Sequence, residues 1–161
     1  MALAEERIGD ILREKGWTLG TVESATGGLI AQRITSVAGS SDYFKGGIIS
    51  YANEIKIAVV GVKKETLEEF GAVSHQVAEQ MASGGRNVLR VDVCVADTGI
   101  AGPGGATPGK PVGLFYLGLA DRKGCTSRRY EFQGNREENR RQAAEAVLQW
   151  LLDYLESGTG R

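Results

Sequence analysis

One short segment has the residue types found where a strand turns sharply into a helix and presents reactive groups. The segment Gly20-Thr-Val-Glu-Ser-Ala-Thr-Gly-Gly28 precedes a run of apolar residues at helical spacing from Leu29 to Val37. Such an elbow directs side chains and backbone N–H groups toward one point. Ser24 is therefore a candidate nucleophile. The alternative is that Ser24 or Thr26 is an ordinary helix N-cap, because capping residues far outnumber nucleophiles.

A nucleophilic serine needs a base that accepts its proton. His75 is the only histidine and follows Ser74 at an expected helix start, where a solvent-facing residue is the simpler interpretation. Lys56 is the other candidate, because burial lowers the pKa of a lysine and leaves part of it neutral near neutral pH. It stands between Ile55 and Ile57 in a helix-like run. The alternative is a solvated lysine on an exposed helix face.

A glycine-rich loop runs from Gly99 to Pro111, after an apolar run typical of a strand buried on both faces. The spacing Gly104-x-x-x-x-Gly109-Lys110 satisfies the first part of a Walker A motif, but Pro111 follows where that motif needs serine or threonine. The dinucleotide-binding glycine fingerprint is absent as well. Loops at the carboxyl ends of strands nevertheless bind ligands in open α/β sheets. The alternative is a purely structural loop.

The elbow and the loop can act together only if the strands before them are neighbours. If the strands that end at Val22 and Thr98 lie side by side, both loops line one crevice. Arg136 and Arg140 add a further candidate group, because residues four apart on a helix share one face and could clamp a phosphate. The alternative is that both arginines pair with neighbouring glutamates on the surface.

Hydrophobic periodicity and turn residues predict six helices and five strands in a single domain over residues 1–161. The helices are expected at residues 2–15, 29–37, 53–60, 64–70, 74–89 and 137–155. The strands are expected at residues 17–22, 44–51, 91–98, 112–120 and 126–132, the last two as a hairpin. Strands that alternate with helices predict a three-layer α/β/α fold around a mixed, mostly parallel sheet.

Composition and charge exclude several classes of protein. The chain has 19 basic and 20 acidic residues among 161. This balance lacks the excess of basic residues that is typical of proteins that bind nucleic acid or an anionic membrane. No secretion signal or membrane-length apolar run is present, so we expect a cytoplasmic protein. Cys94, Cys125 and His75 are too few for the usual zinc site. Since α/β domains of this size often dimerise, a homo-oligomer is expected.

Seven short blocks in order along the chain closely resemble the CinA C-terminal domain family, whose stand-alone members are nicotinamide-nucleotide amidases. The blocks are Glu23-Ser-Ala-Thr-Gly-Gly28, Gly39-Ser-Ser41, Tyr51-Ala-Asn-Glu-Ile-Lys56, Gly71-Ala-Val-Ser74, Thr98-Gly-Ile-Ala-Gly-Pro-Gly-Gly105, Lys110-Pro-Val-Gly113 and Gly134-Asn-Arg136. The resemblance covers nearly the whole chain. It implies hydrolysis of the carboxamide of nicotinamide mononucleotide to nicotinic acid mononucleotide and ammonia.

The resemblance implies a role for each candidate residue. Ser24 corresponds to the family's serine nucleophile and Lys56 to its base, with Tyr51 assisting. Backbone N–H groups of the elbow, those of Thr26, Gly27 and Gly28, would stabilise the oxyanion or else bind the phosphate. The ribose and phosphate of this small-molecule nucleotide would be held by residues of the later loop and the last helix: Thr98, Gly99, Gly102, Gly104, Arg136 and Arg140. No metal or cofactor is required by this mechanism.

The chain departs from the family pattern at two positions. Ala25 stands where the family commonly has cysteine, which leaves Ser24 as the attacking group. Asn135 stands where the family has aspartate, so one carboxylate is lost. The alternative function is a non-catalytic domain that binds a nucleotide or a partner through the same loops, and a further alternative is hydrolysis of another amide.

Overall fold

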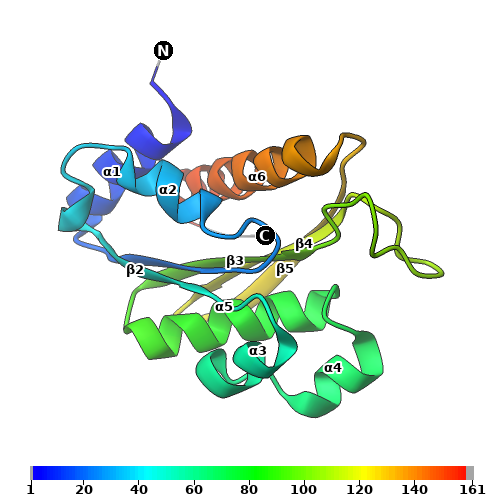
Figure 1. Cartoon of the computed structure of the whole chain (residues 1–161). Helices are drawn as coiled ribbons and strands as arrows, with labels where there is room; N and C mark the ends of the chain where they lie inside the picture. The colour runs from blue at the N-terminus through cyan, green and yellow to red at the C-terminus, as the bar shows by residue number, and fades with distance from the viewer. Residues whose placement is uncertain (1, 159–161) are drawn as a thin grey trace.

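Five strands form a mixed sheet in the order β2-β1-β3-β4-β5 (Figure 1). The structure is a computed structural model and describes residues 2–158. Its strands are β1 (Leu19–Glu23), β2 (Phe44–Ile49), β3 (Val93–Gly99), β4 (Leu114–Asp121) and β5 (Gly124–Glu131). β1 is parallel to β2 and β3, whereas β4 is antiparallel to β3 and β5. Four strands thus run in one direction, and the predicted mixed sheet is confirmed.

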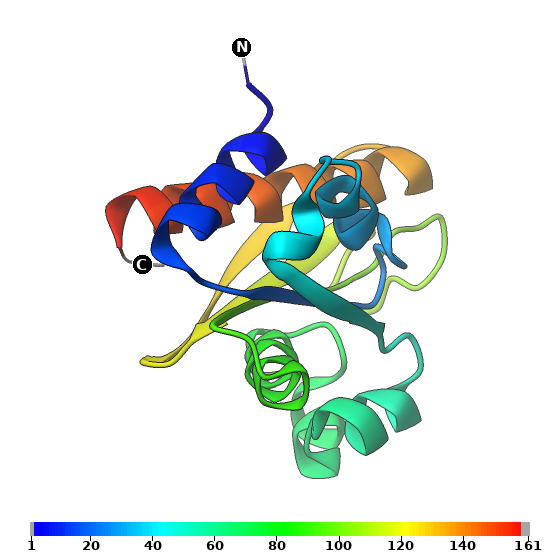
Figure 2. The same ribbon diagram turned by 90° about the vertical axis from the view of Figure 1, so that its left-hand side faces the viewer.

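Helices cover both faces of the sheet and form the predicted outer layers (Figures 1 and 2). One face carries α1 (Ala4–Lys15), α2 (Leu29–Thr35) and α6 (Arg136–Ser157), and the other carries α3 (Asn53–Val60), α4 (Lys64–Phe70) and α5 (His75–Leu89). Each face has its own apolar core. Val95 and Phe115 belong to the first core, and Cys94 and Met81 belong to the second. Successive side chains of β3 point to opposite faces, which is why Cys94 and Val95 are divided in this way.

The predicted central strand is confirmed as β3. Its residues from Val93 to Thr98 are buried, and β1 is buried along its whole length. The two strands pair in parallel, with Val22 opposite Ala96, so they end side by side at one edge of the sheet. The elbow after β1 and the loop after β3 therefore meet, so the condition for a shared crevice is met. The buried run also includes a carboxyl side chain, that of Asp97, which is 0% exposed.

Local signals set the helix ends close to their predicted positions. Gly16 and Gly61 follow α1 and α3 with φ values of 69° and 76°, a left-handed conformation that glycine adopts without strain. The Ser74 hydroxyl caps α5 by accepting the N–H of Val77 at 3.2 Å. Asn135 caps α6 in the same manner, so this helix begins one residue earlier than predicted.

The hairpin of β4 and β5 has a shorter turn than the sequence predicts. Asp121 Oδ1 accepts the N–H groups of Lys123 and Gly124 at 2.8 and 3.2 Å, and β5 consequently begins at Gly124. Cys94 and Cys125 are both free thiols. Within residues 2–158, no helix combines the length and apolar character needed to cross a membrane.

Candidate functional site

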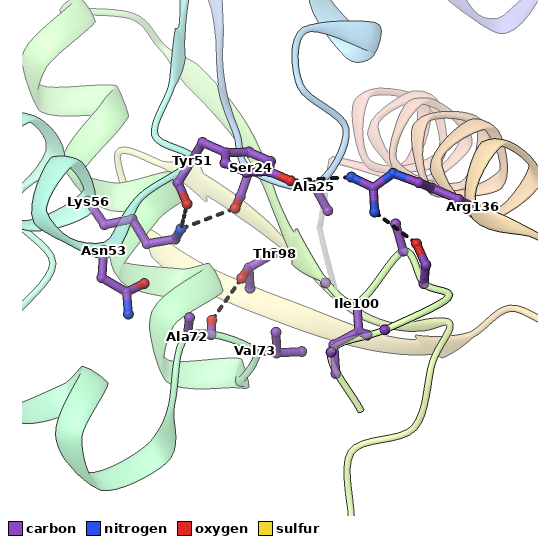
Figure 3. Close-up of a pocket in the computed structure, with 15 residues that line it drawn as sticks. Ser24, Ala25, Tyr51, Asn53, Lys56, Ala72, Val73, Thr98, Ile100 and Arg136 are labelled. Carbon is purple, nitrogen blue, oxygen red and sulfur yellow. Dashed lines mark hydrogen bonds between the residues drawn. The ribbon is translucent and has the colours of Figure 1, made fainter. Parts of the chain in front are cut away.

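The elbow after β1 and the loop after β3 line one cavity of about 260 Å³ (Figure 3). The start of α3, the segment before α5 and the start of α6 complete its wall. Eight residues singled out from the sequence line the cavity: Ser24, Tyr51, Lys56, Thr98, Gly99, Gly102, Gly104 and Arg136. Seven others line it without having been assigned a role: Ala25, Asn53, Ala72, Val73, Ile100, Ala101 and Gly105. Thr26, Gly27, Gly28 and Arg140 lie outside it.

The side chains of Ser24 and Lys56 point toward each other across the cavity wall (Figure 3). Lys56 Nζ lies 3.1 Å from Ser24 Oγ and donates to the carbonyl oxygens of Ser50 and Tyr51, each at 2.9 Å. Lys56 is 1% exposed, although it belongs to the short and mostly exposed helix α3. The solvated-lysine alternative is therefore wrong, and the pairing of Ser24 with Lys56 is present.

This hydrogen bonding suits a lysine that acts as a base. A protonated Lys56 donates to all three oxygens, whereas a neutral amine donates to the two carbonyls and directs its lone pair at the Ser24 hydroxyl. Burial lowers the pKa of Lys56, and the negative charge of Asp97 opposes this by raising it. The pocket thus favours the neutral amine that a serine nucleophile needs.

Most N–H groups of the elbow are already hydrogen-bonded within the protein. Those of Thr26, Gly27 and Gly28 donate to Asp97 Oδ2, the Ser24 carbonyl and Glu23 Oε1, each at 3.1 Å. The structure therefore contradicts the prediction that these three groups face a ligand. Among the described residues, the Ala25 N–H is the one elbow amide from Ser24 to Gly28 without an acceptor, and Ala25 lines the cavity.

The side chain of Glu23 explains why the elbow amides turn inward. Glu23 is 1% exposed and also accepts the N–H groups of Ile30 and Ala31, each at 2.9 Å. A carboxylate at this position satisfies the unpaired donors of the first turn of α2 and the positive end of its dipole. The helix is thus capped by Glu23, and the alternative in which the side chain of Ser24 or Thr26 is its N-cap is wrong.

A second buried carboxyl group, Asp97, fixes the elbow from the neighbouring strand β3. It accepts the N–H groups of Ser24 and Thr26 at 3.0 and 3.1 Å and contacts Thr26 Oγ1 at 2.5 Å. Burial raises the pKa of Asp97 to about 6, opposed by these hydrogen bonds and aided by the charge of Glu23. We did not predict a role for Asp97, although an acidic residue inside an apolar strand run is a signal that could have identified it.

The loop after β3 offers unused backbone donors to the cavity. Within the described chain, the N–H groups of Ala101, Gly102, Gly104 and Gly105 donate to no protein acceptor. Gly102 and Gly105 have φ values of 91° and 97°, which favour glycine at both positions. Thr98, by contrast, uses its hydroxyl to bind the Ala72 carbonyl at 2.8 Å. Successive unpaired amides of this kind suit an anionic group.

Arg136 and Arg140 do not act as the predicted pair. Arg136 lines the cavity and donates to the Gly102 carbonyl at 2.8 Å and to the Tyr51 hydroxyl at 3.3 Å. Arg140 instead donates to the carbonyls of Ala25 and Thr26, each at 3.0 Å, from behind the elbow. A shared phosphate clamp is therefore not present, and only Arg136 is placed to meet a ligand.

The single histidine lies apart from Ser24. His75 is exposed, with Nδ1 2.7 Å from Ser127 Oγ and its ring against the edge of Tyr116. A Ser-His pair is thus not formed at the elbow. Among residues 2–158, no group of three His, Cys, Asp or Glu side chains is arranged to hold a metal ion.

An α/β domain with a serine–lysine pair at the carboxyl edge of its sheet is the class that the fold and site define. The chain belongs to the CinA C-terminal domain family, whose model matches residues 2–155. It is 48% identical to a CinA-like protein from Geobacter sulfurreducens and 46% identical to one from a Sulfurihydrogenibium species, with 96% of the chain covered in each case. It spans 41% and 39% of the lengths of these two relatives.

Solved structures share the whole fold. A competence-damaged protein (CinA) superfamily protein from Klebsiella pneumoniae superposes with a TM-score of 0.92 at 29% identity, and 96% of each chain is covered. A competence/damage inducible protein from Agrobacterium tumefaciens superposes with a TM-score of 0.88 at 39% identity, covering 97% of this chain and 99% of that one. The resemblance that the seven sequence blocks indicated is thus confirmed at the level of the family.

Proposed function

We propose that this domain hydrolyses the carboxamide of nicotinamide mononucleotide, giving nicotinic acid mononucleotide and ammonia. The observation that carries the proposal is the contact of Lys56 Nζ with Ser24 Oγ at 3.1 Å. The carbonyl oxygens of Ser50 and Tyr51 accept the other hydrogen bonds of the lysine. This geometry supports amide hydrolysis through an acyl-enzyme. The nucleotide substrate is inferred from the resemblance of the sequence blocks.

The first half of the reaction forms the acyl-enzyme. Neutral Lys56 accepts the Ser24 proton as Oγ attacks the carboxamide carbon. The developing oxyanion is stabilised by the Ala25 N–H, which occupies the place after the nucleophile that supplies oxyanion donors at other nucleophile elbows. Protonated Lys56 then gives its proton to the departing nitrogen, and ammonia leaves.

The second half regenerates the serine. Lys56, neutral again, accepts a proton from a water that attacks the acyl carbon, and it returns this proton to Ser24 as the acid leaves. Tyr51 contributes through its carbonyl, which orients Lys56, and through its hydroxyl, which meets Arg136 at the mouth of the cavity. The phosphate would be held by Arg136 and the unpaired amides from Ala101 to Gly105.

The direct test is ammonia release from nicotinamide mononucleotide by the purified protein. Ser24→Ala and Lys56→Met variants should fold, as judged by circular dichroism, and lose activity by at least about a hundredfold, because the nucleophile or its base is gone. Ser41→Ala and Lys45→Ala, at exposed positions, are matched controls that should keep it. Normal turnover by Ser24→Ala would contradict the covalent mechanism. Thermal stabilisation by the nucleotide with no ammonia released would instead support the non-catalytic binding domain.

A further inference from the structure

Two buried carboxyl groups share one threonine hydroxyl beneath the elbow. Thr26 Oγ1 lies 2.7 Å from Glu23 Oε1 and 2.5 Å from Asp97 Oδ1. All three side chains are buried, at 0 to 1% exposure. Neither carboxyl forms an ion pair within the described residues. Both contacts are as short as good hydrogen bonds between oxygen atoms.

If Glu23 and Asp97 are both ionised, the cluster has too few hydrogens for both contacts to be hydrogen bonds. A threonine hydroxyl has one hydrogen and can donate to only one of the two carboxylates. The other contact would then place two lone pairs, one of them on an anion, against each other in a buried site, which is strongly unfavourable. A proton on one of the two acids removes this conflict, because that acid donates to Thr26 and Thr26 donates onward.

The surrounding donors indicate which acid holds the proton. Glu23 accepts three backbone N–H groups from the start of α2, so both of its oxygens already act as hydrogen-bond acceptors there. Asp97 lies deeper, on the central strand, and accepts two N–H groups. We propose that Asp97 carries a proton that it donates to the Thr26 hydroxyl, which in turn donates to Glu23, and that this proton controls the charge felt by Lys56.

The second part of this proposal rests on the proposed function, in which Lys56 is the base. Neutral Asp97 still holds the elbow through the N–H groups of Ser24 and Thr26, so Asp97 is a positioning residue. When Asp97 loses its proton, its negative charge raises the pKa of Lys56 and reduces the fraction of neutral amine. The protonated cluster is therefore the form that favours nucleophilic attack by Ser24.

The direction of the pH dependence follows from the groups around Asp97. The charged groups around Asp97 are Glu23 of β1, Lys56 of α3 and Arg140 of α6, which binds the elbow carbonyls. On β4, the residue paired with Asp97 is the uncharged Leu117. The pKa of Asp97 is about 6 in the folded protein against a usual 3.8, with burial as the main cause. Folding therefore favours the proton, and Asp97 lowers the stability of the protein as the pH rises through this interval.

The first experiment requires no enzymatic activity. In Asp97→Asn, an amide nitrogen in place of Oδ1 can donate to Thr26 as the protonated acid does, and it never becomes charged. This nitrogen no longer accepts the Ser24 N–H, a cost that is the same at every pH. We expect the melting temperature of Asp97→Asn, relative to the wild type, to increase as the pH is raised from about 4 to about 8. Asp153→Asn, which removes an exposed carboxylate on α6, is the matched control and should give a constant difference. A constant difference for Asp97→Asn would overturn the proposal.

Wild-type protein gives a second test if the variant fails to fold. Carbon-13 labelling of aspartate carboxyl groups separates Asp97 from Glu23, because glutamate remains unlabelled. We expect one aspartate signal to titrate near pH 6, well above the usual value of 3.8. If every aspartate titrates at or below that usual value, the proton is not on Asp97 and the proposal is wrong.

The pH profile of the reaction then tests the link to Lys56. The ratio of kcat/KM for Asp97→Asn to that of the wild type should rise severalfold between about pH 5 and about pH 8, since only the wild type acquires the negative charge. A purely structural role would lower kcat/KM by the same factor at every pH. Failure of the amidase proposal would leave the melting and titration results unaffected.

Discussion

Two arginines one turn apart on α6 have different partners. Under the proposed function, Arg136 binds the substrate, whereas Arg140 supports the elbow that carries the nucleophile. Arg136 donates to Gly102 and Tyr51 at the cavity, whereas Arg140 holds the carbonyls of Ala25 and Thr26. Sequence spacing places both on one face of a helix but does not say which acceptors that face meets. The difference can be measured in KM and kcat.

We expect Arg136→Met to raise KM for nicotinamide mononucleotide by about tenfold to a hundredfold, corresponding to about 1.4 to 2.7 kcal/mol, because a charged donor to the phosphate is lost. The effect should be much smaller for the phosphate-free nucleoside. Arg140→Met is the matched comparison: it should lower kcat and cost about 1 to 3 kcal/mol of stability, because two elbow carbonyls lose a charged donor. An equal rise in KM for nucleotide and nucleoside in Arg136→Met would contradict the assignment.

The candidate site could be predicted from the sequence only in part. The pairing of Ser24 with Lys56 was predictable from their residue types together with the family resemblance, and the position of the loop after β3 from the rule that parallel strands end at one edge. The orientation of the elbow amides was not. It depends on Glu23 folding back over the start of α2 and on Asp97 reaching across from β3, and neither contact has a sequence spacing that reveals it.

The position of Lys56 depends on how closely helix α3 packs on helix α5. A Cβ atom at Gly84 of α5 would lie 1.7 Å from the carbonyl oxygen of Val60, the last residue of α3. Glycine at this position therefore permits the backbones to touch. Lys56 lies one turn before Val60 on the same helix.

We expect Gly84→Ala to displace α3 and to lower stability by about 1 to 3 kcal/mol, even though alanine favours an isolated helix by about 1 kcal/mol. Activity should fall further than stability explains, because a shift of about 1 Å at Lys56 can cost up to about a hundredfold in rate. Urea unfolding and ammonia release measure the two effects. Ser83→Ala, on the neighbouring residue, is the control and should change neither. Unchanged stability in Gly84→Ala would show that the helices can separate without cost.

The elements themselves were well predicted, because their signals are local. Glycine in the left-handed conformation ends α3, and the Ser74 cap begins α5. The differences arise where a side chain makes a contact that periodicity does not encode. Asp121 tightens the hairpin turn, and Asn135 with Glu138 extends α6 by one residue at its start. The pairing that brings β1 beside β3 is a tertiary property, which local sequence patterns do not determine.

One side of the domain exposes apolar side chains close to the cavity that contains Ser24 and Lys56. Ile49 at the end of β2, Tyr51 after it, and Ile55, Ile57 and Val59 on α3 are between 37 and 60% exposed. Single exposed apolar residues are ordinary, but a group contributed by one edge strand and the helix that follows it is typical of a contact surface. The same segment carries Lys56, so a contact there would hold α3 in place.

We expect the protein to self-associate through this side, in keeping with the homo-oligomer predicted from domain size. Ile55 and Val59 are four residues apart and share a face of α3, so the double variant Ile55→Lys/Val59→Lys should sediment as a monomer because the added charges cannot be buried without a partner. Leu3→Lys changes an exposed leucine before α1, and it should leave the association unchanged. A wild type that sediments as a monomer at every concentration would contradict this prediction, and α3 would then be held in place by its packing on α5 within one copy of the chain.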